Sequence, residues 1–471
     1  MASIADRLQR VASGVGERLG ITRALVYSVL GRVWSVMAGP VSLVLIGRFL
    51  SPEEQGFYYT FWSVLGLWVF FDLGLGLVIV QFASHERAAL RLENGRMTGD
   101  PRAKERLASL FHLALRWYGY AGALMLAFIL PAGIIFFSHY HRGGGKVVWL
   151  WPWILLSITG MINVLIGPLT SILEGSGLFH DVALMRLLQG MSANVCLWIA
   201  LFLGADLYAA VVLNGMMALF GLTWLFVRHR GFFLDLRSVP SEQHRIRWRE
   251  EIWPFQWRFA VSWMTGYFMF QIFNPILFAT SGPRVAGQMG MSLMITTVIG
   301  LFAQAWITTR AVDYGALVAS RDYARLDRTF RATLVQSLVV IVALAGLVLL
   351  GIELLRRIGH PLAARVLPPL PLLLLIVATL LNHIVNTEAS YLRAWKREPF
   401  LVIYAPMCAV TAIGSLLVAK RFGVTGMVSV LVAAVAVIGV GCGTILFMAR
   451  RREWRDEEAL DAAVATEMLQ P

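Results

Sequence analysis

The chain has 471 residues, of which 58% are hydrophobic and only 15% are charged, and its mean hydropathy is +0.68. The hydrophobic fraction and mean hydropathy are higher, and the charged fraction lower, than in soluble globular domains, which indicates an integral membrane protein. The formal net charge of +13 fits membrane topology and attraction to anionic headgroups, so no nucleic-acid partner is expected.

The N-terminal segment, residues 1–22, precedes the first apolar run. Its apolar residues recur on one stripe at helical spacing, which predicts a helix lying on the cytoplasmic membrane surface. Because this segment is basic and leads into a full-length span, no cleavable signal peptide is expected. An N-terminal lobe, residues 23–228, is predicted to hold six transmembrane helices, at 23–47, 57–82, 107–137, 147–173, 182–203 and 206–227.

A polar strip, RFLSPEEQGFYYTF, joins the first two spans. Ser51 suits an N-cap, Pro52 suits the first helical position, and Glu54 completes a capping box three residues after the cap. The strip is therefore predicted to be a short turn that starts a helix on the outer face.

A polar cytoplasmic linker, residues 229–253, separates this lobe from a second group of apolar runs. Unbroken runs such as SLVVIVALAGLVLLGI exclude a beta-barrel, whose strands alternate over about ten residues. The predicted fold class is all-α integral membrane, with about 12 transmembrane helices in two six-helix lobes. The C-terminal lobe, residues 254–449, takes spans at 254–280, 285–308, 330–352, 368–391, 400–419 and 424–449, and a cytoplasmic tail of residues 450–471 follows.

The distribution of Lys and Arg predicts the orientation. The connections on one side carry about three times as many of these residues as those on the other, and the richer side is expected to be cytoplasmic. Both termini then lie inside. The outer connections are too short to hold an active site of their own.

The first helices of the two lobes share one spacing, because Arg23 to Pro40 and Arg258 to Pro275 are both seventeen residues apart. A proline frees backbone groups and bends a membrane helix, so Pro40 and Pro275 are hinge candidates of a two-lobed transporter. A chance match of two common membrane prolines is the alternative.

Four segments carry a family resemblance: RFLSPEEQGFYYTFWSV, FFDLGLGLVIVQFASHE, AGQMGMSLMI and YLRAWKREPF. They resemble the bacterial polysaccharide flippases of the multidrug/oligosaccharidyl-lipid/polysaccharide exporter superfamily, and Arg48, Leu50, Gly56 and Tyr58 match the outer hairpin of those flippases. The resemblance implies two lobes around a central cavity. It also implies that a polyprenyl-diphosphate-linked oligosaccharide is flipped from the cytoplasmic to the outer leaflet of the bacterial inner membrane for polysaccharide biosynthesis. The expected partners are this lipid-linked substrate and membrane lipids, and a polysaccharide polymerase or glycosyltransferases are candidate protein partners.

Intramembrane charge is where such a protein would bind a diphosphate, because each buried charge is costly unless it faces water or a partner. Arg32 and Arg116 lie deep in the first and third spans and are the candidate phosphate ligands. A structural ion pair with a neighbouring helix is the alternative for each. Asp72, in the middle of the second span, is interpreted either as a cation-coupling carboxylate or as the ion-pair partner of Arg32.

The tenth span contains a polar run, TLLNHIVNTEASYLRAW. Asn382, His383 and Asn386 fall on one broad helical face, whereas Glu388 points away from it. That face is a candidate cavity wall that binds sugar hydroxyls, and interhelical hydrogen bonding is the alternative.

No nucleotide-binding loop, catalytic group, cofactor site or metal site is expected, because the sequence lacks the corresponding motifs. Two alternatives to the flippase stay open. A drug or small-cation exporter of the same fold would favour acidic and aromatic cavity walls, and a membrane polysaccharide polymerase or ligase would need a larger outer loop with paired catalytic groups.

Overall fold

The computed structural model describes residues 23–93, 95–142, 146–239, 244–395 and 397–467, so the predicted surface helix of residues 1–22 lies outside the described part. Within these ranges the secondary structure is helical except for one two-stranded hairpin, which confirms the predicted all-α class. Nine described helices are long and apolar enough to cross a membrane. A tenth crossing results if the bent pair Pro52–Asp72 and Leu75–Arg87 counts as one span.

The described residues form two compact units. The first unit contains residues 23–50 and 64–263, and the second contains residues 51–63 and 264–467. The chain passes between the units three times: just before α3 (Pro52–Leu65), near the end of α3, and within α11 (Trp253–Phe270). Residues 51–63, which follow the first span of the predicted N-terminal lobe, therefore pack with the second unit.

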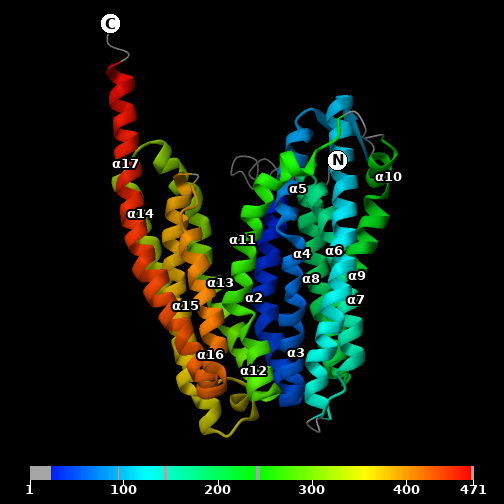
Figure 1. Cartoon of the computed structure of the whole chain (residues 1–471), viewed down its shortest axis with the longest axis vertical. Helices are drawn as coiled ribbons and strands as arrows, with labels where there is room; N and C mark the ends of the chain where they lie inside the picture. Colours follow the sequence, from blue (N-terminus) through cyan, green and yellow to red (C-terminus); the bar gives the residue numbers. More distant parts are fainter. Residues whose placement is uncertain (1–22, 94, 143–145, 240–243, 396, 468–471) are drawn as a thin grey trace, which may run out of the picture. The chain divides into compact units, whose positions relative to one another are not determined.

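Long helices run side by side in the first unit (Figure 1). Its apolar core lies among the helices that follow the first span, with α5, α6 and α7 contributing most of the buried side chains. Besides the end of α3, the first unit consists of α2 (Arg23–Phe49), η1 (Gly66–Trp68), α4 (Val69–Asp72), α5 (Leu75–Arg87), α6 (Pro101–Arg142), α7 (Leu150–Gly175), α8 (Phe179–Phe202), α9 (Tyr208–Arg228), α10 (Arg230–Ser238), η2 (Trp248–Ile252) and the first part of α11. The antiparallel strands β1 (Leu90–Glu93) and β2 (Arg96–Gly99) connect α5 to α6.

The second unit has its own core, built around Tyr391 and Phe447. Tyr391 is fully buried among aromatic rings of three neighbouring helices. Besides most of α3 and the end of α11, this unit consists of α12 (Phe273–Ser281), α13 (Pro283–Ala319), α14 (Tyr323–Arg357), η3 (Pro361–Arg365), α15 (Pro369–Leu392), η4 (Arg393–Trp395), α16 (Leu401–Ala434), η5 (Val435–Cys442) and α17 (Gly443–Glu467).

The last apolar run, Leu401–Glu457, is 57 residues long. At 1.5 Å per residue it would extend about 85 Å, far more than the hydrocarbon thickness of about 30 Å. Gly423 interrupts it with a non-helical φ of 56° and ψ of −147°. The break falls between the predicted spans at 400–419 and 424–449, so two helices meet there, as the sequence predicts.

The capping box predicted for the polar strip is confirmed. Helix α3 begins at Pro52, the Ser51 backbone N–H donates to Glu54 Oε2 at 2.8 Å, and the Glu54 N–H donates to Ser51 Oγ at 3.2 Å. The helix then packs tightly within the second unit. A Cβ atom on Gly56 would lie 1.9 Å from the Pro283 carbonyl oxygen, so only glycine permits this approach. The Gln55 side chain completes the junction by donating to the Gly287 carbonyl at 2.8 Å.

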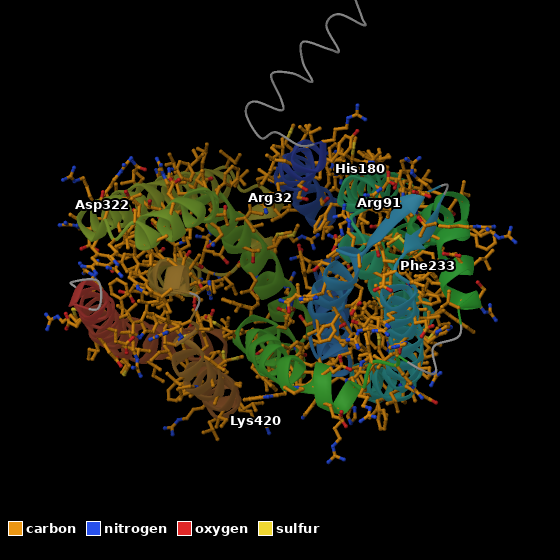
Figure 2. All side chains as sticks on the ribbon, turned by 90° about the horizontal axis from the view of Figure 1, so that it is seen from above. Arg32, Arg91, His180, Phe233, Asp322 and Lys420 are labelled. Atoms are coloured by element: carbon orange, nitrogen blue, oxygen red, sulfur yellow. The ribbon has the colours of Figure 1, made fainter. Side chains whose placement is uncertain are left out.

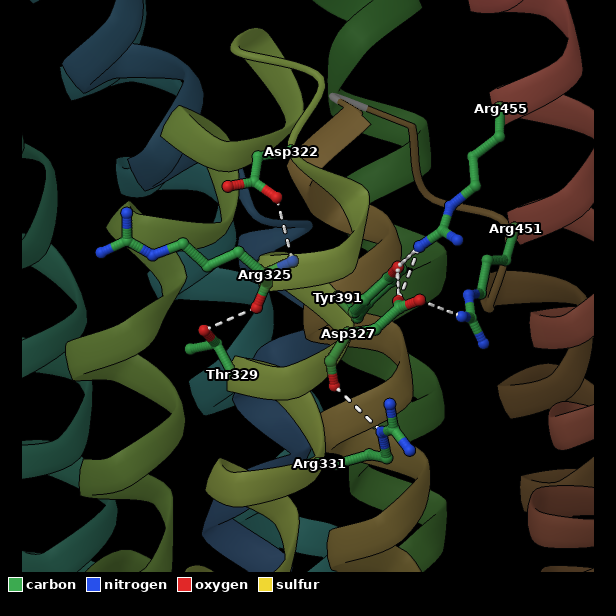
Figure 3. A network of polar contacts seen from close by, with 8 residues as sticks. All are labelled: Asp322, Arg325, Asp327, Thr329, Arg331, Tyr391, Arg451 and Arg455. Atoms are coloured by element: carbon green, nitrogen blue, oxygen red, sulfur yellow. Dashed lines mark hydrogen bonds and ion pairs between the residues drawn. The ribbon is translucent and has the colours of Figure 1, made fainter.

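A charged network links helices of the second unit (Figure 3). Asp327 of α14 is the centre: its carboxylate accepts hydrogen bonds from the guanidinium groups of Arg451 and Arg455 on α17 and from the hydroxyl of Tyr391 on α15 at 2.7 Å. The network joins three helices, and the Asp327 side chain is only 17% exposed. It is therefore expected to contribute more than a surface ion pair does.

We expect Asp327→Asn to lower the free energy of unfolding by about 1–3 kcal/mol, because two partly buried guanidinium groups lose their anion. Thermal unfolding of the purified protein in detergent measures this. Asp313→Asn is the matched control, because Asp313 forms a half-exposed i,i+3 pair with Arg310 and should change stability by less than about 0.5 kcal/mol. Equal unfolding curves for the two variants would contradict the assignment.

Candidate functional site

A small cavity of about 220 Å³ in the first unit is lined by cationic and aromatic side chains. Helix α6 supplies most of its wall, because residues spaced by three, four, seven and eight positions share one helical face. The rest comes from the segment that leads into η2. The lining residues are Ser109, His112, Leu113, Arg116, Trp117, Tyr120, Arg245 and Trp248.

Three contacts fix the segment that brings Arg245 and Trp248 to α6. The Ile246 backbone N–H donates to Ser109 Oγ at 3.0 Å, and the Trp117 and Trp248 rings stack with centroids 5.3 Å apart. Arg106 bridges Glu86 of α5 and Glu251 of η2, each at 2.7 Å. These contacts therefore hold Arg245 and Trp248 in the part of the cavity wall that α6 does not supply.

The anchoring ion pair favours the charged form of Glu251. Burial alone would raise the pKa of Glu251, but hydrogen bonds from the Arg106 guanidinium and the Arg247 backbone hold this pKa below its usual value. Glu251 thus remains ionised when free carboxyl groups begin to protonate.

Both arginines of the cavity are free to bind an anion. Among the described residues, no carboxylate or hydrogen-bond acceptor pairs with Arg116 or Arg245, whereas Lys104 and Arg106 nearby are paired. Two ring nitrogens in the wall, His112 Nδ1 and Trp117 Nε1, are buried without a hydrogen-bond partner. The unpaired Trp117 N–H donor lies beside two guanidinium groups, an arrangement suited to phosphate oxygens, which Arg binds in a bidentate manner.

A second hollow, of about 540 Å³, lies along α9 and offers less chemistry. Its lining residues all come from that one helix, and its arginine, Arg228, is neutralised by Asp181 at 3.0 Å. Size alone therefore does not identify the site.

Arg32 lies on α2 (Figure 2), and its side chain is exposed. Helix α2 packs on α8, where Ser42 accepts a hydrogen bond from Trp198 at 2.9 Å. Within the described residues, Arg32 forms no ion pair with Asp72 or with any other carboxylate. The structure therefore leaves Arg32 without the structural partner that was the alternative to ligand binding.

Asp72 sits at a break in the second span. Leu73 and Gly74 adopt left-handed φ values of 51° and 68°, and across these two residues the helical run Pro52–Asp72 bends by 45° into α5. The carboxylate is 5% exposed and accepts hydrogen bonds from the Tyr118 hydroxyl at 2.5 Å and the Gly74 N–H at 3.1 Å. A buried carboxylate at an interrupted membrane helix is typical of ion-binding sites in transporters.

We expect Tyr118→Phe to lower the free energy of unfolding by about 1–3 kcal/mol, because one oxygen of buried Asp72 loses its donor. Thermal unfolding in detergent measures the loss. Tyr120→Phe serves as the control, because Tyr120 is 73% exposed and its hydroxyl has no described partner. A Tyr118→Phe protein as stable as the control would argue against a structural role of the pair.

The polar face predicted on α15 is partly occupied by interhelical hydrogen bonds. His383 is 4% exposed and its Nε2 lies 2.7 Å from Ser337 Oγ of α14. Asn386 Oδ1 accepts from the Tyr404 hydroxyl of α16 at 2.9 Å. Asn382 Oδ1 is buried without a partner, so it is the member of this face with an unsatisfied acceptor. A role of the three residues in binding sugar stays a prediction.

The two hinge candidates have different surroundings. Pro40 lies inside the uninterrupted helix α2, whereas Pro275 lies in α12, just after the interruption at residues 271–272 that separates α11 from α12. Because proline cannot donate to the carbonyl four residues earlier, Pro275 removes a bond across this interruption. The neighbouring Asn274 side chain donates a hydrogen bond to Ser63 Oγ of α3, at 3.0 Å. Movement at either proline stays a prediction.

Comparison with known proteins places the fold. No protein-family model matches the chain, and no curated protein sequence matches it significantly. Among solved structures, an inward-facing multidrug resistance MATE family transporter of the MOP superfamily has a TM-score of 0.63 at 16% identity and covers 91% of this chain and 99% of its own. The MATE multidrug transporter DinF-BH has a TM-score of 0.58 at 13% identity, covering 90% and 94%.

The lipid II flippase MurJ, in an inward closed conformation, has a TM-score of 0.52 at 14% identity and covers 91% of this chain and 87% of its own. These neighbours are transporters and a flippase rather than enzymes. The chain is thus a multi-pass membrane protein with a transporter fold. The chain shares its fold with these structures, and this fold is the one that the resemblance seen in the sequence implies.

Proposed function

We propose that this protein flips an oligosaccharide linked to a polyprenyl diphosphate from the cytoplasmic to the outer leaflet of the bacterial inner membrane, for polysaccharide biosynthesis. The observation that carries this proposal is the cavity in which Arg116 and Arg245 lack anionic partners among the described residues. Two guanidinium groups match the charge and oxygen geometry of a diphosphate.

The cavity volume limits what it holds. At about 220 Å³ it is smaller than a typical site for a drug-sized ligand. It is therefore assigned to the diphosphate, while the sugar occupies a larger space. Arg32 is a third proposed phosphate ligand besides Arg116 and Arg245, and Asn382, His383 and Asn386 are the proposed sugar ligands.

Support also comes from a solved structure whose printed name describes a similar function. MurJ is a lipid II flippase by name, and the described chain shares its fold across most of both lengths. The Lys and Arg distribution assigns the cavity end of α6 to the cytoplasm, where lipid-linked precursors would be loaded. Both termini are then cytoplasmic, and a polymerase or glycosyltransferases would act before or after the flip.

A drug or small-cation exporter is the second candidate, because two of the neighbours above are multidrug transporters. An organic cation would be repelled by unpaired Arg116 and Arg245, whereas an anionic headgroup is attracted. This charge difference favours the lipid-linked sugar.

Ligand binding to the purified protein tests the proposal. Trp117 and Trp248 line the cavity, so their fluorescence should change when the headgroup binds. We expect saturable quenching by a polyprenyl-diphosphate oligosaccharide and none by a lipophilic organic cation. The reverse order of the two ligands would favour the drug exporter.

A further inference from the structure

We propose that Glu388 of α15 is a proton-binding site in the second unit, where a carboxyl group takes a proton from water and returns it during the transport cycle. This inference rests on the proposed function and deepens it by assigning the ion that drives it. The site itself can be tested without any transported substrate.

The carboxyl group of Glu388 is isolated from cations. It is 5% exposed, and Oε1 accepts one hydrogen bond, from the Thr444 hydroxyl of α17 at 2.8 Å. Oε2 is buried without a hydrogen-bond partner. In the described part of the chain no Arg, Lys or His forms an ion pair with Glu388, in contrast to Asp327, which has two arginines.

Such a group is costly as an anion. A carboxylate in the bilayer interior that lacks a cation and has an unsatisfied oxygen is stabilised by holding a proton, which removes the charge. Holding the proton also supplies an O–H donor. Releasing the proton leaves a carboxylate that needs water or a new partner. The protonated and deprotonated forms of Glu388 therefore favour different surroundings.

The neighbouring helices bring hydroxyl, phenol and thiol groups to this part of α15, but no described cation that pairs with Glu388. Tyr404 is within electrostatic reach of Glu388, but its hydroxyl already donates to Asn386. Tyr391, one helical turn after Glu388, is held by Asp327 and Arg455. The ionisable groups on the helices packed against α15 in this region include Tyr404 and Cys408 of α16, Tyr314 of α13, Asp327 of α14, Arg451 and Arg455 of α17, and Arg393 of η4, which pairs with Glu398 at 2.7 Å.

A proton fits this site better than a metal ion. Among the described residues, no group of three or more His, Cys, Asp or Glu side chains could hold a metal. The groups bonded to Glu388 amount to a single hydroxyl, which is too few oxygen ligands for a cation that demands six or more. A proton needs only the carboxylate.

Infrared spectroscopy of the full-length protein in liposomes tests the site directly. Protonated carboxyl groups absorb at a different infrared frequency from carboxylates. In a pH titration, the neutral-pH spectrum of the wild type should contain a protonated-carboxyl band that is missing from Glu388→Gln. Glu353→Gln is the matched control, because Glu353 pairs with Arg357 and is half exposed; it should leave that band unchanged. If Glu388→Gln does not fold, Thr444→Val keeps the carboxyl group, removes its hydrogen bond and should shift the band.

Two results would overturn the proposal: a neutral-pH spectrum that is the same in the wild type and in folded Glu388→Gln, or no band shift in Thr444→Val. A second arm measures transport under an imposed pH gradient, and we expect Glu388→Gln to lose the stimulation by the gradient. If Glu388→Gln loses the infrared band but the wild type flips no oligosaccharide, the proposed function is refuted and the proton site stands.

Discussion

The double variant Arg116→Gln, Arg245→Gln is expected to lose nearly all transbilayer movement of the lipid-linked oligosaccharide. Each guanidinium is assigned hydrogen bonds to the diphosphate worth about 1.5–3 kcal/mol, which corresponds to about 10- to 100-fold in affinity per arginine. Removing both should therefore lower apparent affinity by about 100-fold or more. The side chains are exposed and lack described partners, so the unfolding temperature should not fall.

Titration of the transport rate against substrate concentration measures this loss. Arg237→Gln is the matched control in the same unit, because Arg237 is exposed on α10 and does not line the cavity. It should transport as the wild type does. Wild-type affinity in the double variant would remove the cavity from the binding site.

We expect Gly56→Ala to destabilise the second unit severely, by about 3 kcal/mol or more. The added Cβ would lie 1.9 Å from the carbonyl oxygen of Pro283, and backbone atoms cannot move aside as a flexible side chain can. The measurements are the yield of monodisperse protein and its unfolding temperature.

Gly346→Ala is the matched control, because Gly346 is also helical, lies in the second unit, and has open space where its Cβ would go. Alanine is a better helix former, so this change should be neutral or stabilising by up to about 1 kcal/mol. If Gly56→Ala behaved like Gly346→Ala, the close approach of α3 and α13 would be disproved.

The helices themselves could be predicted from the sequence, because unbroken apolar runs of membrane length leave few alternatives. The start of α3 was equally readable, since Ser51, Pro52 and Glu54 act through local contacts. The assignment of α3 to the second unit was not predictable. It depends on the fit of Gly56 against Pro283 and Gly287, more than two hundred positions away in the chain.

The candidate site could be predicted only in part. The depth of Arg116 in its span was visible, but Arg245 reaches the same cavity through the Ser109 hydrogen bond, which no sequence pattern announces. Asp72 was singled out as an intramembrane carboxylate and is buried in the structure, yet its partner Tyr118 was missed, because a tyrosine in a membrane helix is common. Glu388 was noticed only as pointing away from the polar face, and its isolation emerges from the absence of a cation in its described surroundings.

The most direct measurement of the central claim is movement of a polyprenyl-diphosphate oligosaccharide across proteoliposomes that contain the purified protein. Sugar that reaches the outer leaflet is scored by an external glycosidase. We predict accessibility well above that of protein-free liposomes, and a fall to that background in the double variant Arg116→Gln, Arg245→Gln. Background accessibility with folded wild-type protein, across several glycans, would contradict the account and shift support to the drug exporter.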